Sequence, residues 1–314
     1  MDHKDRSPIL VLLGVILLIV GSAMAFVGPV EIYVFYLFSE GGRFHYEGFG
    51  VGSFMFANIA AQIVGYYLIA MVAIPLGYGH IKRLRWARTL TLTLLGFWLV
   101  AGIPLLVVFL FVLVTSKGLS LLTGVITLVL LALSYVVAPG LLVRFYRSRD
   151  VRLTFEAQDP RSPWIEGVPL PVLVTCSIFA FTVAVLHVLI LFHGVFPVLH
   201  VLVFGLQGIV LIDLSMLVLL ALTWGSLRLR RWAWWGSLLY WSLLTFSSIA
   251  ALSRSSLADI LSGMKFAPLE MEALGGVPMH GAHLAVLVGI PLLVTLGLIA
   301  YSRRFFGQRR DPAS

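Results

Sequence analysis

Charged residues are scarce in this chain, because Asp, Glu, Lys and Arg make up only 11% of its 314 residues. A soluble domain carries about 25% charged residues, so a globule of this composition could not cover its surface with polar groups. Hydrophobic residues make up 60% of the chain, and the mean hydropathy is +1.01. The composition therefore predicts an integral membrane protein, whose apolar surface is solvated by the bilayer.

Cysteine is almost absent, since Cys176 is the only one and lies inside an apolar run. A single cysteine excludes an intrachain disulfide and any CxxC metal or redox motif. The chain also lacks the GxSxG, HExxH, P-loop and dinucleotide-binding fingerprints. No segment outside the apolar runs is long enough to form a domain that hydrolyses ATP. These absences favour a non-enzymatic role.

Long apolar runs dominate the sequence, and eight of them can cross the roughly 30 Å hydrocarbon core of a bilayer. Only helices or closed barrels satisfy the backbone in that medium, and these runs are too long and too evenly apolar for barrel strands. We therefore expect an all-α, polytopic membrane helix bundle with eight transmembrane helices. The expected spans are 8–28, 53–77, 89–114, 119–143, 168–192, 199–223, 233–251 and 282–301.

Lys and Arg concentrate on alternate connections between these spans. With the N-terminus inside, the cytoplasmic segments hold 18 of the 22 basic residues; these segments are 1–7, 78–88, 144–167, 224–232 and 302–314. The opposite side holds Arg43, Lys117, Arg254 and Lys265. The positive-inside rule then places both termini in the cytoplasm, in an inner or plasma membrane. The pI of about 9.9 indicates contact with anionic lipid and requires no nucleic acid.

The first span has an alternative interpretation. The segment "SPILVLLGVILLIVGSAMAF" has a short apolar core and ends near Ala23-Met24-Ala25, which resembles a signal-peptide cleavage site. Cleavage would leave seven spans and an N-terminus outside. The barely basic start of the chain, and the repeat described next, favour retention of this span.

A basic-aromatic phrase occurs twice, as "GHIKRLRWARTL" from residue 79 and as "GSLRLRRWAWWG" from residue 225. Both copies join a span that runs inward to the next span that runs outward. The aligned pairs are Gly79/Gly225, Lys82/Arg228, Arg85/Arg231, Trp86/Trp232 and Ala87/Ala233. The phrases predict an internal duplication, although the positive-inside rule and the interfacial preference of Trp favour similar phrases without one.

The duplication predicts two four-helix halves, over 1–147 and 168–303, joined by a cytoplasmic linker over 148–167 and followed by a basic tail over 304–314. Because each half has an even number of spans, both insert in the same orientation, as in a parallel repeat with a pseudo-two-fold axis along the membrane normal. The expected membrane-interface anchors are Arg85, Trp86, Arg231 and Trp232, with the arginines directed to lipid phosphate and the Trp rings at headgroup level.

Asp213 lies about ten residues, or roughly 15 Å, from the inner end of its expected span. A carboxylate near mid-membrane is a functional-site hypothesis by default. Asn58 and Gln62 share one face of the second span, and Gln207 lies in the same span as Asp213. These four residues predict a polar interior for ion or proton coupling. The alternative is interhelical hydrogen bonding that holds the bundle together.

Several histidines are expected at the outer ends of the spans. They are His187, His193, His200, His280 and His283. Neutral imidazole is the commonest metal ligand, so one hypothesis is an outer metal or haem site. Their spacing matches no defined metal signature, and the sequence requires no cofactor.

The aromatic-rich segment 31–53 is expected to be an interfacial or re-entrant segment, and the amphipathic segment 252–281 to lie on the outer surface. The leading functional hypothesis is a binding or translocation module, either a small permease-like protein or a non-catalytic membrane subunit of a larger complex. One alternative is a membrane oxidoreductase or a metal- or haem-binding protein that uses the outer histidines. Another is a structural scaffold subunit that binds lipid or pigment. The expected partners are membrane lipids and either other membrane subunits or further copies of this chain.

Overall fold

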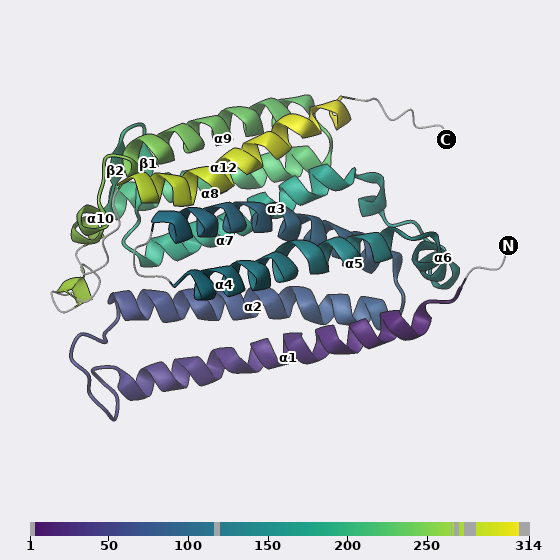
Figure 1. The fold of residues 1–314 in the computed structure, drawn as a ribbon, viewed down its shortest axis with the longest axis horizontal. Helices are drawn as coiled ribbons and strands as arrows, with labels where there is room; N and C mark the ends of the chain where they lie inside the picture. Colours follow the sequence, from purple (N-terminus) through teal and green to yellow (C-terminus); the bar gives the residue numbers. More distant parts are fainter. Residues whose placement is uncertain (1–3, 116–119, 265, 267–269, 273–280, 308–314) are drawn as a thin grey trace.

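The chain folds into a bundle of long helices that run roughly side by side along its long axis (Figure 1). The computed structural model describes residues 4–115, 120–264, 266, 270–272 and 281–307. Within these residues, eight helices are long and apolar enough to cross a membrane. The prediction of an all-helical fold with eight helices of membrane-spanning length is therefore confirmed, and this fold is compatible with a multi-pass membrane protein.

Six of the eight spans are single helices, one is built from three consecutive segments, and the last ends in a short 3₁₀ helix. The first half comprises α1 (Ser7–Phe38), α2 (Phe54–Ile81), α3 (Arg85–Thr115), and the span formed by α4 (Leu121–Ala132), the π-helix η1 (Leu133–Val137) and α5 (Ala138–Arg147). The second half comprises α7 (Leu170–Leu191), α8 (Gly205–Leu227), α9 (Arg231–Leu252), and α12 (Gly281–Ser302) with the short 3₁₀ helix η3 (Arg303–Phe305) at its end.

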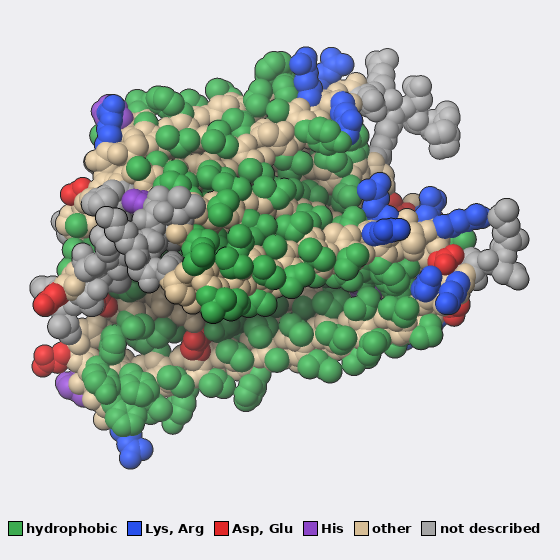
Figure 2. Space-filling view, viewed as in Figure 1, with side chains coloured by type: hydrophobic (Ala, Val, Ile, Leu, Met, Phe, Trp, Pro, Cys, Tyr) green, Lys and Arg blue, Asp and Glu red, His purple; other side chains and the backbone are tan. Residues whose placement is uncertain are grey.

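The start of α1 and the end of α12 lie at the same end of the bundle (Figure 1), as an even number of spans requires. Lys and Arg side chains gather mainly at this end (Figure 2). We name it the basic end, defined by Arg6 before α1 and Arg303 after α12. The charge asymmetry read from the sequence is thus an asymmetry of the folded bundle.

The first span is longer than expected, because α1 continues to Phe38 and covers 32 residues, or about 48 Å at 1.5 Å per residue. The segment 31–53, expected to be interfacial or re-entrant, begins as a continuation of α1, because its first eight residues are helical. Pro29 lies inside α1, and the next helix-breaking residues are Gly41 and Gly42. Phe38 then stacks on Phe44 of the following loop, with ring centroids 4.9 Å apart.

The connections hold more secondary structure than the sequence indicated. A hairpin of β1 (Phe196–Val198) and β2 (Val201–Val203) joins α7 to α8, so α8 begins six residues after the expected start of its span. The linker contains α6 (Arg149–Gln158) and η2 (Trp164–Gly167). The connection between α9 and α12 contains α10 (Leu257–Met264).

The two copies of the repeated phrase form the same turn. Arg83 and Leu229, which align with each other, both have φ of +53°. The backbone hydrogen bonds also match; they run from Leu84 to Gly79 (2.8 Å), Arg230 to Gly225 (3.0 Å), Arg83 to His80 (3.1 Å) and Leu229 to Ser226 (2.9 Å). The phrase is therefore a structural unit that reverses the chain tightly at the basic end.

The paired glycines explain how the two helices of each turn meet so closely. A Cβ atom at Gly79 would lie 2.6 Å from Cβ of Ala87, and one at Gly225 would lie 2.7 Å from Cβ of Ala233. In both copies the same Cβ would also lie within 3.0 Å of the ring of the preceding tryptophan. The Trp rings therefore pack on the glycines, and the sequence match reflects shared packing.

We expect Gly225→Ala to destabilise the protein, because the added methyl group would overlap Trp232 and Ala233. Overpacking of this kind costs about 1–3 kcal/mol, which should lower the Tm of the purified protein by several degrees in a thermal scan. Gly140→Ala in α5 is the matched control, since a Cβ there meets no atom within 4 Å. Equal Tm values for the two variants would contradict the shared-packing explanation.

The two halves occupy different places in the bundle. In the first half, α3 is central and packs on α2, α5, α7 and α12. Its counterpart in the repeat, α9, packs on α12, α8 and the β-hairpin. The main buried core lies among α7, α8, α9 and α12, where the rings of Phe179 and Trp241 stack at 5.7 Å. Duplication of whole halves stays a prediction.

Candidate functional site

The helices α1 and α2 form a tight antiparallel pair built on glycine. Gly14, Gly21 and Gly28 recur every seven residues along α1 and are all buried. A Cβ atom on any of them would lie less than 3.0 Å from an atom of α2. Gly77 of α2 returns the contact, because its Cβ would lie 2.7 Å from the carbonyl oxygen of Gly14. This close backbone approach is a typical way for helices to associate in membranes.

The α1–α2 pair joins the rest of the bundle most firmly at the basic end. There Leu10 is fully buried in a cluster with Leu92, Tyr146, Val151 and Phe155. Beyond this cluster, towards mid-bundle, the pair separates from α3 and α5. The structure leaves a cavity of about 590 Å³ in that space, lined by α1, α2, α3, α5 and Phe181 of α7. We call it the groove.

The groove is apolar and opens on the side of the bundle. Its lining carries polar side-chain atoms only on Thr91, Trp98 and Tyr146. Ile16, Ile69 and Trp98 lie at its mouth and are 46%, 47% and 48% exposed. Figure 2 shows the surface hollowed between α1 and the α4–α5 span. The groove thus faces the region that lipid chains occupy around a membrane bundle.

A buried histidine lies behind Thr91 and Tyr146, which line the groove at the basic end. His80 is fully buried, with Nδ1 2.7 Å from the carbonyl oxygen of Leu76 and Nε2 2.7 Å from the hydroxyl of Tyr146. A carbonyl oxygen can only accept, so Nδ1 carries a proton. The ring is fully buried against neutral groups, where a second proton would leave an unpaired buried charge, so Nε2 is unprotonated and accepts from Tyr146. The imidazole is therefore neutral, and the phenol oxygen keeps lone pairs for accepting a further hydrogen bond. Thr91 Oγ1 lies 3.5 Å from His80 Nε2.

This polar base of the groove was not identified from the sequence. The available signal was a histidine within the last turn of α2, beside the basic residues of the repeated phrase. Its aligned partner in the second copy is Ser226, which is also buried. The side chain of Tyr146, which His80 requires, comes from the end of the fourth span, and no local pattern links the two.

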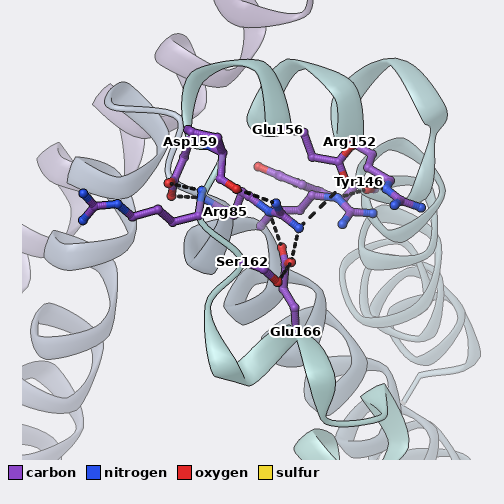
Figure 3. Close-up of polar contacts among 10 residues, drawn as sticks. Arg85, Tyr146, Arg152, Glu156, Asp159, Ser162 and Glu166 are labelled. Atoms are coloured by element: carbon purple, nitrogen blue, oxygen red, sulfur yellow. Dashed lines mark hydrogen bonds and ion pairs between the residues drawn. The ribbon is translucent and has the colours of Figure 1, made fainter. Parts of the chain in front are cut away.

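An ionic network lies next to this base, at the start of α3 (Figure 3). Arg85 forms a two-point ion pair with Glu166 of η2, with Nε 3.1 Å from Oε1, and its backbone N–H donates to Asp159 at 3.1 Å. Ser162 also donates to Glu166, at 3.2 Å. Arg152 of α6 pairs with Glu156 at 2.7 Å, and this hydrogen bond raises the pKa of Arg152. The network fastens the linker to α3.

We expect Glu166→Gln to loosen the linker, because it removes the charge from a pair whose side chains are only 16% and 17% exposed. Hydrogen bonds to charged groups contribute about 1.5–3 kcal/mol, so amide hydrogen exchange over 149–167 should accelerate markedly. Arg152→Gln serves as the control, because Arg152 is 62% exposed and such surface pairs contribute about 1 kcal/mol or less. Exchange over 149–167 at the wild-type rate in Glu166→Gln would show that the Arg85–Glu166 pair does not hold the linker.

The four polar residues predicted to share an interior are not brought together. Asp213 and Gln207 are exposed on α8, whereas Gln62 is exposed and Asn58 partly buried on α2. Gln62 Oε1 lies 3.5 Å from the hydroxyl of Tyr66. Asp213 occupies the exposed face of α8 with Leu206, Val210 and Leu217. The hydropathy pattern could not reveal which face of α8 is exposed, because α8 is largely apolar on all sides and Gln207 and Asp213 do not lie on one face.

The predicted histidines are also dispersed. His187 is exposed, and its Nδ1 lies 2.8 Å from the carbonyl oxygen of Val183. His193 contacts the carbonyl oxygen of Gly52 at 3.2 Å, and His200 is exposed at the tip of the β-hairpin. His283 packs on Phe111 with ring centroids 5.5 Å apart, and His280 lies outside the described residues. Within the described parts of the chain, no three His, Cys, Asp or Glu residues are grouped as metal ligands would be.

The predicted interface anchors differ between the two copies. Trp86 and Trp232 pack on the paired glycines, and Trp232 is 49% exposed. Arg85 pairs with Glu166, as described above, whereas Arg231 is exposed and contacts the carbonyl oxygen of Gly307 at 3.5 Å. The two aligned arginines therefore have different environments.

No protein-family model, no curated protein and no solved structure matches this chain.

Proposed function

We propose that this chain is a non-catalytic membrane protein that binds a lipid-like amphiphile in the groove. The observation that carries this proposal is the groove itself, an apolar cavity of about 590 Å³ that opens on the side of the bundle. Ligand sites are typically concave and apolar, with a few polar groups that fix orientation. The groove has that composition, with the hydroxyl groups of Thr91 and Tyr146 at its base and the indole of Trp98 at its mouth.

The chemistry of the base defines how the ligand lies. The apolar walls from α1, α2 and α3 accommodate a hydrocarbon chain. The oxygen of Tyr146 accepts a hydrogen bond from a hydroxyl or amide on the ligand, because its own proton is donated to His80. The ligand therefore lies with its chain towards mid-bundle and its polar end at the basic end.

Binding is a better-supported role than translocation. A translocation path would need polar side chains that face one another across the bundle. The exposed positions of Asp213, Gln207 and Gln62 offer no such path among the described residues. The hypothesis of an oxidoreductase or metal-binding protein has no support from the placement of the four described histidines.

The orientation and repeat complete the proposal. The basic end faces the cytoplasm of an inner or plasma membrane, because the segments expected there hold 18 of the 22 basic residues. The two halves arose by duplication, a proposal supported by the identical turns at residues 79–87 and 225–233.

We expect Gly65→Phe to fill the groove without disturbing the fold. Gly65 lines the groove, and a Cβ atom there meets no atom within 4 Å. The wild-type protein, extracted into nanodiscs and examined by native mass spectrometry, should retain a discrete lipid-sized adduct. The variant should retain at least fivefold less of it, because a phenyl ring occupies the site of the ligand chain.

Gly297→Phe in α12 is the matched control, since Gly297 is exposed, has open space around a Cβ atom and lies outside the groove. It should retain the adduct at the wild-type level. An adduct that survives Gly65→Phe, or is lost equally in both variants, would contradict a ligand in the groove.

A second role, as a subunit of a membrane complex, is favoured by Asp213. Its carboxylate lies on the exposed face of α8 about 12 Å from the start of the helix, at 1.5 Å per residue. A carboxylate that faces hydrocarbon is costly. The chain has no Lys or Arg within its own spans beyond their basic ends. We propose that a transmembrane helix of a partner donates a hydrogen bond to Asp213.

We expect Asp213→Leu to abolish association with that partner and Asp213→Asn to preserve part of it, because an amide still forms interhelical hydrogen bonds. The measurement is the assembly mass after gentle extraction from the native membrane. Gln207→Leu is the control, since this residue lies about 120° away around α8. A wild-type protein that migrates alone, or an assembly insensitive to Asp213→Leu, would refute the role.

A further inference from the structure

A second cavity lies at the basic end of the other half, between the start of α9 and the end of α12. Its volume is about 350 Å³, and it is lined by Arg231, Trp234, Trp235, Arg303 and Phe306. It therefore combines two guanidinium groups with three aromatic rings. It is separate from the groove, because the two share no lining residue.

The positive charge of this cavity is not balanced by the described part of the chain. The ion pairs among the described residues involve Arg6, Arg85 and Arg152, and none includes Arg231 or Arg303. Both arginines that line the cavity are exposed. Their guanidinium groups are thus available to an anion from outside the fold.

The walls of the cavity are held in place by other contacts. The Nε1–H of Trp234 donates to the carbonyl oxygen of Ile299 at 2.8 Å, and this ring is only 6% exposed. The guanidinium carbon of Arg303 lies 5.5 Å from the centroid of the same ring, within the range of a cation–π contact. Gly307, with φ of +82°, packs against Arg231, since a Cβ atom at Gly307 would overlap the Arg231 side chain. The site is therefore partly formed before a ligand binds.

The first copy of the repeated turn shows which group binds to an arginine at this position. Arg231 aligns with Arg85, and the two turns have the same backbone geometry. In the first copy the carboxylate of Glu166 pairs with Arg85 at two points. In the second copy no described carboxylate takes that place. An anion with two oxygens in a similar arrangement would complete the second copy.

We infer that this cavity binds a phosphate group, with Arg231 and Arg303 as its donors. Guanidinium groups match phosphate oxygens in a two-point geometry. The Trp and Phe rings that also line the cavity suit the glycerol and upper acyl region of a phospholipid at a membrane interface. Basic pockets between membrane helices on the cytoplasmic side bind anionic headgroups in this way. A soluble phosphate offers the same group, and the experiment below separates the two sources.

The test compares nanodiscs of phosphatidylcholine alone with nanodiscs that contain phosphatidylglycerol in addition, using native mass spectrometry of the released protein. The wild-type protein should retain one phosphatidylglycerol molecule. The double variant Arg231→Gln/Arg303→Gln should retain at least fivefold less, and Arg303→Gln alone should retain an intermediate amount. The charge-matched control is Arg228→Gln/Arg304→Gln, because these residues stack on Trp224 and Tyr301 and lie outside the cavity.

A parallel titration adds inorganic phosphate to the phosphatidylcholine nanodiscs and measures the Tm. A rise in Tm that only the cavity variants lack would support the site with a soluble phosphate as its ligand, whereas selective lipid retention assigns it to the headgroup. Equal lipid retention by the cavity and control variants, with no phosphate effect, would overturn the inference. All variants should share the wild-type Tm in phosphatidylcholine alone, which shows that they are folded. Gly65→Phe should leave phosphatidylglycerol retention unchanged, so that failure of the groove proposal is distinguished from failure of the phosphate site.

Discussion

Close backbone approach between helices is the interaction on which the rest of this structure depends. Lipid tails are as apolar as the side chains of a span, so burial of apolar surface gives membrane helices little reason to associate. Packing at glycine supplies that reason here. Gly14, Gly21 and Gly28 join α1 to α2 along most of their length. The pair therefore behaves as one body, and the groove is the space left where that body diverges from α3 and α5.

The eight spans could be predicted from the sequence because the bilayer requires each span, by itself, to be long and apolar enough to cross it. Length and apolar composition were sufficient to identify all eight spans, and the Gly79 and Gly225 phrases correctly located two chain reversals. The extension of α1 to Phe38 was missed because the aromatic residues after Pro29 suit either an interface or a helix. The β-hairpin was missed because Val and Phe, which favour strands, are also typical of apolar spans. Hydropathy reports which residues leave water, and it does not report their backbone conformation.

The sites were much less accessible from the sequence, because they depend on how each helix is rotated. A helix that is apolar on all sides gives no sign of which face is buried. Asp213 was recognised as unusual, but its exposed position on α8 follows from packing against α7 and α9. His80 and Tyr146 meet across 66 positions of sequence, so only the fold brings them together. No sequence pattern indicates the groove, because it is a space between helices whose own sequences are typical of apolar spans.

The two copies of the repeated turn differ in the charges that surround their aligned arginines, Arg85 and Arg231. Both copies place an arginine at the start of the helix that follows the turn, with the same backbone geometry. In the first half the linker returns to that arginine, and Glu166 neutralises it. The groove beside it therefore ends in the neutral side chains of Tyr146 and Thr91, with the neutral His80 behind them. In the second half the chain continues into η3, which adds Arg303 beside Arg231 and supplies no carboxylate. The same structural unit thus has different surroundings in the two halves, because the linker after the fourth span pairs with Arg85, whereas η3 after the eighth span places Arg303 beside Arg231.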